Sequence, residues 1–391
     1  MKVKSIGVLI AASFGVLGML QAQSSSTVPT NPSRLTGTVE RIKLHGKSLE
    51  HNLEHDSADR DIAIYLPPSY AMNPSRGYPV VYFLHGWTQS SDDWYGATKF
   101  WAKLPTILNN SFTKPGNREM IFVTPDAFTR YQGSFYSNSA TTGNWEDYIV
   151  RELIPYVDAH YRTIPERASR GLAGHSMGGY GALRIGMRHP DVFSSIYLLS
   201  ACCMKFPDSF LLENGVKAEA AKTPEQADAL ENLPRLLVAL SVAWSPNPNN
   251  PPFFADLPVK GGKLAEDIVA KFHANEPLYM IDQYVGNLRE LKDIGMDVGN
   301  KDFPIAESTQ QLDRVLTSYG IPHEFEIYDG NHLDHIADRI ESKVVPFFSR
   351  SLCFDPTSKG SATGAQGLAR QQGPQAAALA AASGYQLALI R

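Results

Sequence analysis

Short apolar runs recur through the middle of the chain, and most are rich in β-branched or aromatic residues. Runs of this length and composition predict β-strands. Several runs are nearly continuously apolar, which is typical of strands covered on both faces, as in a mostly parallel sheet. The strands predicted in this way span residues 80–84, 120–124, 170–174, 194–199, 294–298 and 324–328.

Segments between these runs have helical periodicity. The sequence YIVRELIPYVDAHY (148–161) places Leu153 and Val157 on one face of a helix. The sequence IAESTQQLDRVLTSYG (305–320) has the same kind of face and then reaches Gly320, a residue type that commonly ends a helix. Strands that alternate with helices predict an α/β fold with a mostly parallel central sheet flanked by helices.

Two regions depart from this alternation. Residues 204–290 hold helical pieces separated by the proline- and asparagine-rich SPNPNNPPFF, so we expect a helical, cap-like insert between two core strands. Residues 355–391 are small, polar and repetitive, which predicts a low-complexity, disordered tail, with a short alanine-rich helix as the alternative. The predicted core domain therefore spans residues 23–354.

The first residues have the three-part layout of a secretory signal. Two early lysines precede an apolar run from about residue 6 to residue 20, and small or polar residues follow around Ala22. The apolar run is short for a membrane span. We therefore expect a signal peptide at residues 1–22, a secreted or periplasmic protein and no stable membrane anchoring, with a retained anchor as the alternative.

Composition narrows the class of partner. The chain has 391 residues, of which 43% are hydrophobic, enough for a large buried core. Its formal net charge is −4, and acidic and basic residues are mixed along it. This pattern offers no basic surface for nucleic acid and no polybasic segment for anionic lipid. The expected partner is a small molecule or a polysaccharide, and the oligomeric state stays open.

The chain has three cysteines, Cys202, Cys203 and Cys353. Neighbouring cysteines rarely pair with each other, because their geometry fits the bond poorly. In an exported protein we therefore expect either a bridge from Cys353 to one of the other two or buried free thiols. No cysteine or histidine spacing matches a structural zinc site.

The strongest chemical signal is GHSMG (174–178), which follows a predicted strand and precedes a helical run. It fits the Gly-x-Ser-x-Gly turn that lifts a serine hydroxyl above the edge of a sheet. Such a turn leaves no room for side chains at Gly174 and Gly178. Ser176 is therefore the candidate nucleophile, and a glycine-rich turn with an idle serine is the alternative.

A serine hydroxyl needs a base, and the base needs an acid that orients it. On this type of fold the order along the chain is serine, acid, histidine. His332 begins the loop after the last predicted strand, at the end where α/β sites form. His335 shares that loop and is the alternative base, whereas His323 precedes the strand and should lie at its far end. HLDH (332–335) could suggest a metal site, but no third ligand is evident, so none is expected.

Three carboxylates could orient the histidine. Asp302 follows the predicted strand at 294–298 in a loop that can reach the histidine loop, so it is the preferred acid. Asp297 lies within the strand, where it could equally be a paired core carboxylate. Asp297 and Glu307 remain as alternatives.

An acyl-transfer site also needs backbone N–H groups that meet the developing oxyanion. Met177, directly after the candidate nucleophile, should supply one. The sequence FLHGWTQSSDDW (83–94) places His85 and Gly86 at the end of an early strand, so the N–H of Trp87 is the second candidate. A tight turn with a surface tryptophan is the alternative.

Long blocks of this chain resemble one family of esterases. The blocks, in chain order, are RDIAIYLPPSY, YPVVYFLHGWTQSSDDW, GNWEDYIVRELIPYVDAHYRT, GLAGHSMGGYGALRIGMRHPDVFSSIYLLSA and YDGNHLDHI. The chain is similar over residues 58–350, apart from the insert, to the esterase family that includes feruloyl esterases, enterochelin esterases, S-formylglutathione hydrolases and the mycobacterial antigen 85 acyltransferases. The family often has a tryptophan soon after its final histidine, where this chain reads NHLDHI.

The resemblance implies an α/β-hydrolase fold, a serine mechanism without metal or other cofactor, and Ser176, Asp302 and His332 as nucleophile, acid and base. For an exported member it implies an ester on plant carbohydrate, with feruloyl or acetyl groups first. Trp87, Trp94, Trp145 and aromatic residues of the insert could stack on a sugar or cinnamoyl ring. The residues expected to border the substrate are His85, Gly86, Trp145 and His175.

Other functions remain open at this point. A siderophore esterase or an acyltransferase would keep the same three residues and differ in what the insert admits. A serine peptidase of this fold usually carries a large N-terminal domain, and only about 50 residues precede the core here. A degenerate hydrolase that serves as a binding module should lack one of the three residues, and each has a candidate in this chain.

Overall fold

The computed structural model describes residues 36–98 and 102–355. The predicted signal peptide (1–22) and the predicted tail beyond residue 355 lie outside the described residues. Within the described ranges, no helix is both long enough and apolar enough to cross a membrane.

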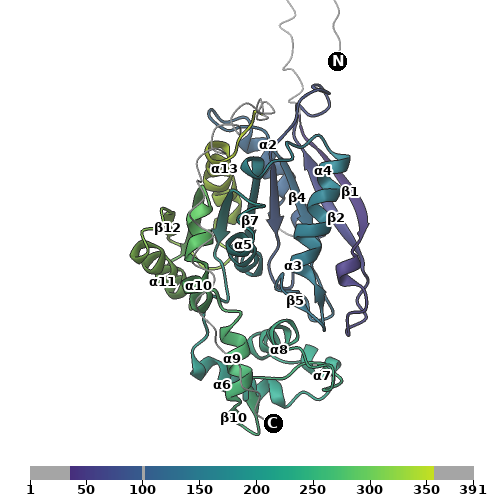
Figure 1. The fold of residues 1–391 in the computed structure, drawn as a ribbon, viewed down its shortest axis with the longest axis vertical. Helices are drawn as coiled ribbons and strands as arrows, with labels where there is room; N and C mark the ends of the chain where they lie inside the picture. Colours follow the sequence, from purple (N-terminus) through teal and green to yellow (C-terminus); the bar gives the residue numbers. More distant parts are fainter. Residues whose placement is uncertain (1–35, 99–101, 356–391) are drawn as a thin grey trace, which may run out of the picture. The chain divides into compact units, whose positions relative to one another are not determined.

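An eight-stranded sheet lies at the centre of the part of the chain that the structure describes (Figure 1). Strand β2 is antiparallel to both of its neighbours, and every other adjacent pair is parallel. In spatial order the strands are β1 (Thr38–His45), β2 (Asp59–Leu66), β4 (Ile121–Pro125), β3 (Val80–Leu84), β7 (Arg170–His175), β8 (Ser195–Leu199), β11 (Asp293–Gly299) and β12 (Glu324–Tyr328).

The six predicted strands are all present, with ends within one residue of the prediction, and the predicted α/β fold is confirmed. Strands β1 and β2 were not predicted. Residues of β1 are mostly exposed, so no apolar run marks it. Its eight residues are held instead by antiparallel pairing with β2.

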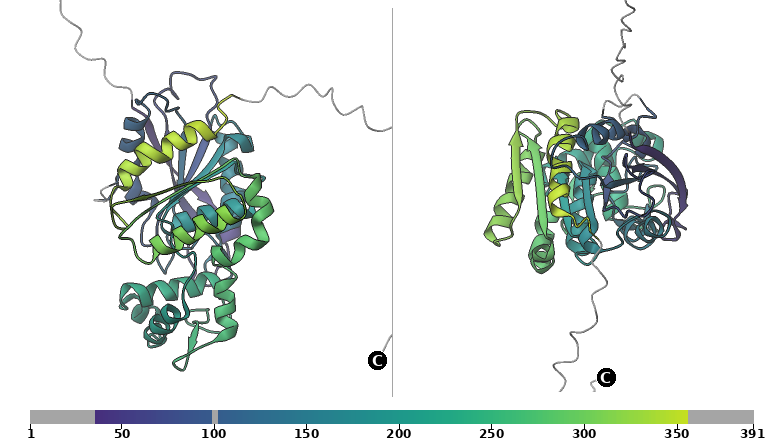
Figure 2. Two further views of the ribbon diagram at one scale, coloured as in Figure 1. Left: turned by 90° about the vertical axis from the view of Figure 1, so that its left-hand side faces the viewer. Right: turned by 90° about the horizontal axis from the view of Figure 1, so that it is seen from above.

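Helices cover both faces of the sheet (Figure 2). One layer consists of the short helix α3 (Trp145–Asp147), the π-helical segment Tyr148–Leu153, α4 (Ile154–His160), α5 (Met177–Arg188), α10 (Pro277–Glu290) and α11 (Ile305–Ser318). The opposite layer consists of α1 (Ser91–Trp94), α2 (Leu104–Ser111), α12 (Ile336–Arg339), the π-helical segment Ile340–Val344 and α13 (Val345–Ser351).

Strand β3 shows how the sheet joins these layers. Its alternate residues Val80, Tyr82 and Leu84 belong to the apolar cluster on one face, while Val81 and Phe83 belong to the cluster on the other. All five residues are buried, as the continuous apolar run predicted. The central strands are therefore fixed on both sides, and the loops at their ends start from rigid positions.

The insert begins after β8 and is helical, as predicted. Its elements are α6 (Asp208–Glu219), α7 (Pro224–Asp228), α8 (Asn232–Trp244), the short strands β9 (Val259–Lys260) and β10 (Lys263–Leu264), and α9 (Glu266–His273). Figure 1 shows α6–α9 grouped together beyond one end of the sheet. Helix α10, which we had assigned to the end of the insert, instead packs against α5 in the helical layer, where Asn287 donates to the Met187 carbonyl at 2.9 Å.

The insert shares the core of the sheet. Trp244 at the end of α8 has its ring centroid 5.9 Å from that of Phe135 and 5.4 Å from that of Tyr180 on α5. On the insert side, the same ring contacts Phe272 of α9 at 5.4 Å. Because Trp244 is only 3% exposed, separating the insert from the sheet would uncover a large aromatic side chain.

A buried carboxylate ties α3 to α5. Glu146 accepts from Arg188 at 2.7 Å and from Arg184 at 3.3 Å, and it lies 2.9 Å from the His189 imidazole. Burial alone would raise the pKa of Glu146, but these three partners outweigh it and lower the pKa to about 2. The ionised carboxylate therefore stabilises the helical layer.

We expect Glu146→Gln to lower the free energy of unfolding by about 3 kcal/mol at pH 7, because the pKa of this group falls from 4.5 to about 2 on folding. A carboxylate whose pKa is lowered on folding stabilises the folded state at pH values above its unfolded pKa. This stabilisation is lost as pH falls from 4.5 towards 2. In urea unfolding, the difference between the two proteins should shrink to about 1 kcal/mol at pH 3. A difference that stays constant with pH would contradict this account.

Glu213→Gln is the matched control. Glu213 makes an ion pair with Lys217 at 3.1 Å, and its side chain is 71% exposed. Removing this pair should change the free energy of unfolding by less than about 0.5 kcal/mol.

Candidate active site

Ser176 lies in a sharp turn between β7 and α5. Its backbone has φ 56° and ψ −116°, a region that non-glycine residues rarely adopt. Three backbone hydrogen bonds hold it there: its N–H donates to the Leu199 carbonyl at 3.0 Å, and its carbonyl accepts from Tyr180 at 3.0 Å and from Cys202 at 3.2 Å. Strand β8 and helix α5 thus fix the turn from two sides.

The glycines of GHSMG have the role predicted for them. A Cβ at Gly178 would run into the backbone of Leu84 on β3, and one at Gly174 would run into the backbone of Gly178. The close approach of α5 to the sheet is therefore possible only with glycine at these two positions.

The structure brings the three predicted residues into one line of hydrogen bonds. The Oγ of Ser176 lies 2.9 Å from Nε2 of His332, and Nδ1 of His332 lies 2.8 Å from Oδ2 of Asp302. Ser176 and Asp302 are buried, whereas the His332 side chain is 33% exposed. The three residues follow β7, β11 and β12 at their carboxyl ends, where ligands bind in open α/β sheets.

The loops that carry Asp302 and His332 are joined directly. The N–H of Lys301 donates to the Gly330 carbonyl at 2.9 Å, and the N–H of Asn300 donates to the Tyr328 carbonyl at 2.8 Å. In return, the Asn300 side chain accepts from the N–H of Gly330 at 3.2 Å. The distance between acid and imidazole is therefore set by backbone contacts as well as by their own hydrogen bond.

The alternative residues have other partners. His335 is exposed, and its nearest carboxylate is Asp338 at 3.7 Å. His323 contacts Asp313 at the far end of β12, as predicted. Asp297 accepts from Tyr197 at 2.8 Å and from Arg339 at 3.0 Å, and burial raises its pKa to about 6 against the opposing effect of Arg339. Asp297 is thus a paired core carboxylate.

The two residues predicted to supply oxyanion donors follow the adjacent strands β3 and β7. Met177 is the first residue of α5, where N–H groups have no partner within the helix. Trp87 lies in the loop after β3, and its indole N–H donates to the Tyr131 carbonyl at 3.0 Å. Among the described residues, neither backbone N–H makes a hydrogen bond. Both groups are therefore available to an anionic oxygen.

Three residues expected to border the substrate are buried. His85 is 0% exposed and Trp145 and His175 are each 1% exposed, so these side chains present almost no surface to a substrate. The indole N–H of Trp145 donates to Thr142 at 2.8 Å, and its ring lies under the Arg60 guanidinium. Gly86 is also buried, and its N–H donates to the Gln89 side chain at 2.9 Å.

His175 packs against His332 and bonds to its backbone. Its Nε2 donates to the His332 carbonyl at 3.0 Å, and the two rings lie 4.8 Å apart. Burial, reinforced by the neighbouring His332, lowers the pKa of His175 to about 3. The ring is therefore neutral at physiological pH and adds no charge beside the site.

Gln89 makes contacts in the loop after β3 that the sequence did not reveal. Its side-chain oxygen accepts from the N–H of Gly86 and from the Trp94 indole, each at 2.9 Å. These bonds close the turn that carries Trp87. A glutamine in a polar loop has no periodicity that would single it out.

The cysteine prediction is wrong. Cys202 and Cys203 form a disulfide with each other, and Cys353 is free. Cys203 has a left-handed backbone (φ 64°), a conformation that lets adjacent side chains turn towards one another. Cys353 is held at the opposite end of the sheet, where its N–H donates to the Ala168 carbonyl before β7 begins, so it cannot reach the turn after β8.

We expect one titratable thiol per unreduced, urea-unfolded chain, and three after reduction. A thiol reagent such as dithionitrobenzoate measures both numbers, and mass mapping identifies the reactive cysteine as Cys353. A peptide that links Cys353 to either of the other two would contradict the pairing described here.

The fold and the turn at Ser176 define the class of protein. A mostly parallel sheet with helices on both faces, and a serine on a tight strand-to-helix turn at its edge, is the α/β-hydrolase fold. Within the residues that the structure describes, no group of three or more histidine, cysteine, aspartate or glutamate side chains is arranged to hold a metal ion.

Comparison with known proteins agrees with this class. The family described as "Putative esterase" matches residues 56–335, and the chain belongs to that family. A curated relative, Esterase Rv1288 of Mycobacterium tuberculosis H37Rv, is 30% identical over 142 residues. The aligned part is 34% of this chain and only 27% of that relative, so the chain spans about a quarter of the relative's length.

Solved structures share the fold at low sequence identity. A ferulic acid esterase has a TM-score of 0.58 at 22% identity, covering 81% of this chain and 100% of that one. The S-formylglutathione hydrolase FrmB of Staphylococcus aureus has a TM-score of 0.53 at 17% identity, covering 80% and 99%. The fluorophosphonate-binding serine hydrolase F of the same organism has a TM-score of 0.55 at 18% identity, covering 80% and 99%.

Proposed function

We propose that this protein is an exported serine esterase that acts through an acyl-enzyme, with Ser176 as nucleophile, His332 as base and Asp302 as acid. The observation that carries the proposal is the continuous line from the Ser176 hydroxyl through His332 to Asp302, with distances of 2.9 and 2.8 Å. Such a line is the arrangement that activates a weak hydroxyl nucleophile.

In the first half of the reaction, Nε2 of His332 takes the proton of Ser176 as the serine oxygen attacks the ester carbonyl. The negative charge on the carbonyl oxygen is met by the N–H groups of Trp87 and Met177. The tetrahedral adduct then breaks its bond to the alcohol, which leaves with the proton held by His332. Asp302 accepts from Nδ1 throughout and stabilises the imidazolium.

In the second half, a water molecule gives a proton to Nε2 of His332 and attacks the acyl-serine. The same two N–H groups hold the second oxyanion. The bond from the acyl carbon to the Ser176 oxygen breaks, and that oxygen recovers the proton from His332. The products are a carboxylic acid and the free enzyme.

For the substrate we propose a feruloyl or acetyl ester of plant carbohydrate. Feruloyl esters are the substrates named by a structure of the same fold, the ferulic acid esterase. The Phe253 ring of the insert lies 6.1 Å from the ring of the buried Tyr131. Near the site, the side chains of Trp87 and Phe253 are only partly buried. These aromatic side chains are suited to a sugar or cinnamoyl ring, whereas Trp94 and Trp145 are fully buried.

We expect the purified chain to hydrolyse methyl ferulate or acetylated xylan, together with p-nitrophenyl acetate, and Ser176→Ala to lose at least about 10³-fold in kcat on each. A cyclic catecholate siderophore and a peptide amide complete the panel. Preference for the siderophore would overturn the carbohydrate assignment and keep the serine mechanism. Equal activity of wild type and Ser176→Ala, or no activity on any ester, would overturn the mechanism.

The assignment of the acid has its own test. Asp302→Asn should lower kcat by about 10³- to 10⁴-fold with the fold intact, because the amide disfavours the histidine tautomer that accepts the serine proton. Asp297→Asn is the matched control, since Asp297 pairs with Arg339 and Tyr197 instead. It should keep kcat within about threefold and lower the melting temperature, because a buried charge loses its partner. Steady-state kinetics and thermal unfolding of both variants decide the matter, and a larger kcat loss in Asp297→Asn would refute the assignment.

A further inference from the structure

The loop after β3 pairs the backbone donors on either side of Trp87. The N–H of Gly86 donates to Gln89 Oε1 at 2.9 Å, that of Thr88 to the Gln132 carbonyl at 2.9 Å, and that of Gln89 to the Gly86 carbonyl at 3.2 Å. Among the described residues, the N–H of Trp87 has no such partner. Because the N–H groups on either side of it are paired, the N–H of Trp87 has a fixed direction and can donate to a group outside the loop.

His85 contacts this loop through both of its ring nitrogens. The N–H of Ala127 donates to Nε2 at 2.8 Å, so Nε2 carries a lone pair and the proton must be on Nδ1. Nδ1 in turn donates to the Gly86 carbonyl at 2.9 Å. Burial lowers the pKa of His85 and outweighs the opposite effect of Asp126, so the ring is neutral.

The bond to the Gly86 carbonyl determines where the N–H of Trp87 points. The Gly86 carbonyl and the Trp87 N–H belong to one planar trans peptide, in which C=O and N–H point in opposite directions. Because Nδ1–H of His85 holds the Gly86 carbonyl on the His85 side of the peptide, the N–H of Trp87 points to the opposite side. Losing that donor would leave the Gly86 carbonyl held only by the N–H of Gln89 at 3.2 Å, so the peptide plane would be less constrained.

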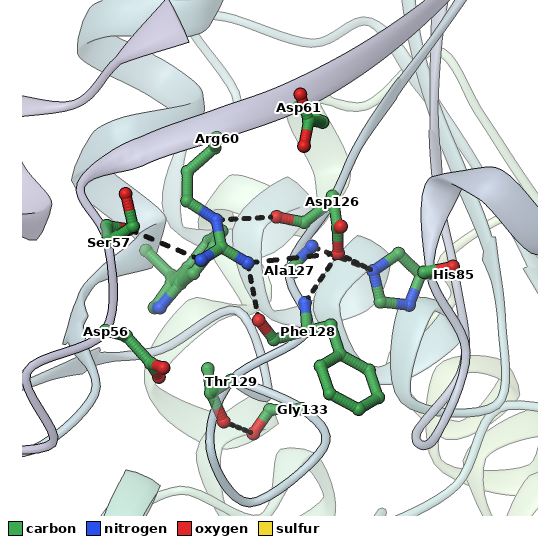
Figure 3. A network of polar contacts seen from close by, with 12 residues as sticks. Asp56, Ser57, Arg60, Asp61, His85, Asp126, Ala127, Phe128, Thr129 and Gly133 are labelled. Carbon is green, nitrogen blue, oxygen red and sulfur yellow. Dashed lines mark hydrogen bonds and ion pairs between the residues drawn. The ribbon is translucent and has the colours of Figure 1, made fainter. Parts of the chain in front are cut away.

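His85 is itself held by the turn after β4 (Figure 3). Arg60 on β2 donates from Nε to the Asp126 carbonyl at 3.1 Å and from a terminal nitrogen to the Phe128 carbonyl. The Asp126 carboxylate accepts from the N–H of Phe128 at 2.9 Å, which tightens the turn around Ala127. The Trp145 ring lies 5.0 Å from the Arg60 guanidinium, which is 8% exposed, so a buried cation–π contact supports the arginine.

We propose that His85 is a positioning residue of the esterase reaction: its Nδ1–H holds the Gly86 carbonyl and thereby aims the N–H of Trp87 at the oxyanion, while Arg60 holds the turn on which the ring rests. The inference rests on the proposed function. It assigns a role to His85, Arg60 and Trp145 that involves no contact with substrate.

Two amide variants separate the two bonds of His85. An Asn side chain can place an amide N–H near the position of Nδ1 and restore the bond to Gly86, while it is too short to accept from Ala127. A Gln side chain reaches the position of Nε2 and can accept from Ala127, but its donor lies past Gly86. His85→Ala removes both bonds.

The experiment measures kcat and KM for p-nitrophenyl acetate, with thermal unfolding of each protein. His85→Ala should lose about 10- to 100-fold in kcat with KM within about threefold, because an oxyanion donor acts mainly in the transition state. His85→Asn should regain a kcat within about fivefold of wild type, and His85→Gln should stay near His85→Ala. Arg60→Gln, which leaves His85 in place, should lose about tenfold in kcat because the N–H of Trp87 is misplaced. If the His85 variants do not fold, the test rests on this variant.

Tyr197→Phe is the control for stability, because it removes a buried hydrogen bond of 2.8 Å to Asp297 on the other face of the sheet. It should lower the melting temperature and keep kcat. In ¹⁵N-histidine spectra, the His85 signal, assigned by its loss in His85→Asn, should be that of a neutral Nδ1–H ring from pH 5 to pH 9.

Three results would overturn the inference. The first is that His85→Gln is as active as His85→Asn, and the second is that kcat in all variants falls with the melting temperature as it does in Tyr197→Phe. The third is that His85 carries its proton on Nε2. In each of these cases turnover by the wild type still disappears in Ser176→Ala, so the proposed function stands. Turnover that survives in Ser176→Ala overturns the proposed function and this inference with it.

Discussion

The strained backbone of Ser176 is the constraint on which the rest of the site depends. A non-glycine residue at φ 56° and ψ −116° persists only where its surroundings over-determine it. Here the N–H of Ser176 donates to a carbonyl of β8. The Ser176 carbonyl accepts from one N–H of α5 and from one N–H of the turn after β8. The backbone of Leu84 lies against Gly178, so β3 also presses on the turn. Three adjacent strands thus converge on one residue, and the serine hydroxyl has a fixed origin.

Two buried, neutral imidazoles connect this turn to the loops around it. His175 donates to the backbone of the His332 loop, and His85 joins the loop after β3 to the turn after β4. A neutral imidazole offers one donor and one acceptor at a fixed separation, so it can tie two loops together without adding charge. A lysine or arginine at either position would bring a cation beside His332 or the oxyanion site. In the proposed mechanism, three histidines of the same neighbourhood therefore serve two different purposes.

The sequence predicted those features whose cause is local. Continuous apolar runs identify strands that are buried on both faces, whereas β1 is exposed along most of its length and has no such run. The spacing of Gly174 and Gly178 reveals the serine turn because the steric requirement lies within five residues. Asp302 could be preferred to Asp297 because it follows the strand. In contrast, the burial of His85 and Trp145 depends on Ala127 and Arg60, which are distant in the chain, so their direction could not be read from the residues beside them.

The distance along the chain between the proposed nucleophile and base has a consequence for biosynthesis. Ser176 and His332 are 156 positions apart, and the insert, β11 and β12 lie between them. The serine turn is built from strands that leave the ribosome early, but the imidazole arrives with the last strand of the sheet. A nascent or incompletely folded chain therefore carries a serine with no base beside it. Under the proposed mechanism, reactivity begins only when the final parallel strand has joined the sheet, so the hydroxyl is inert while the chain is being made.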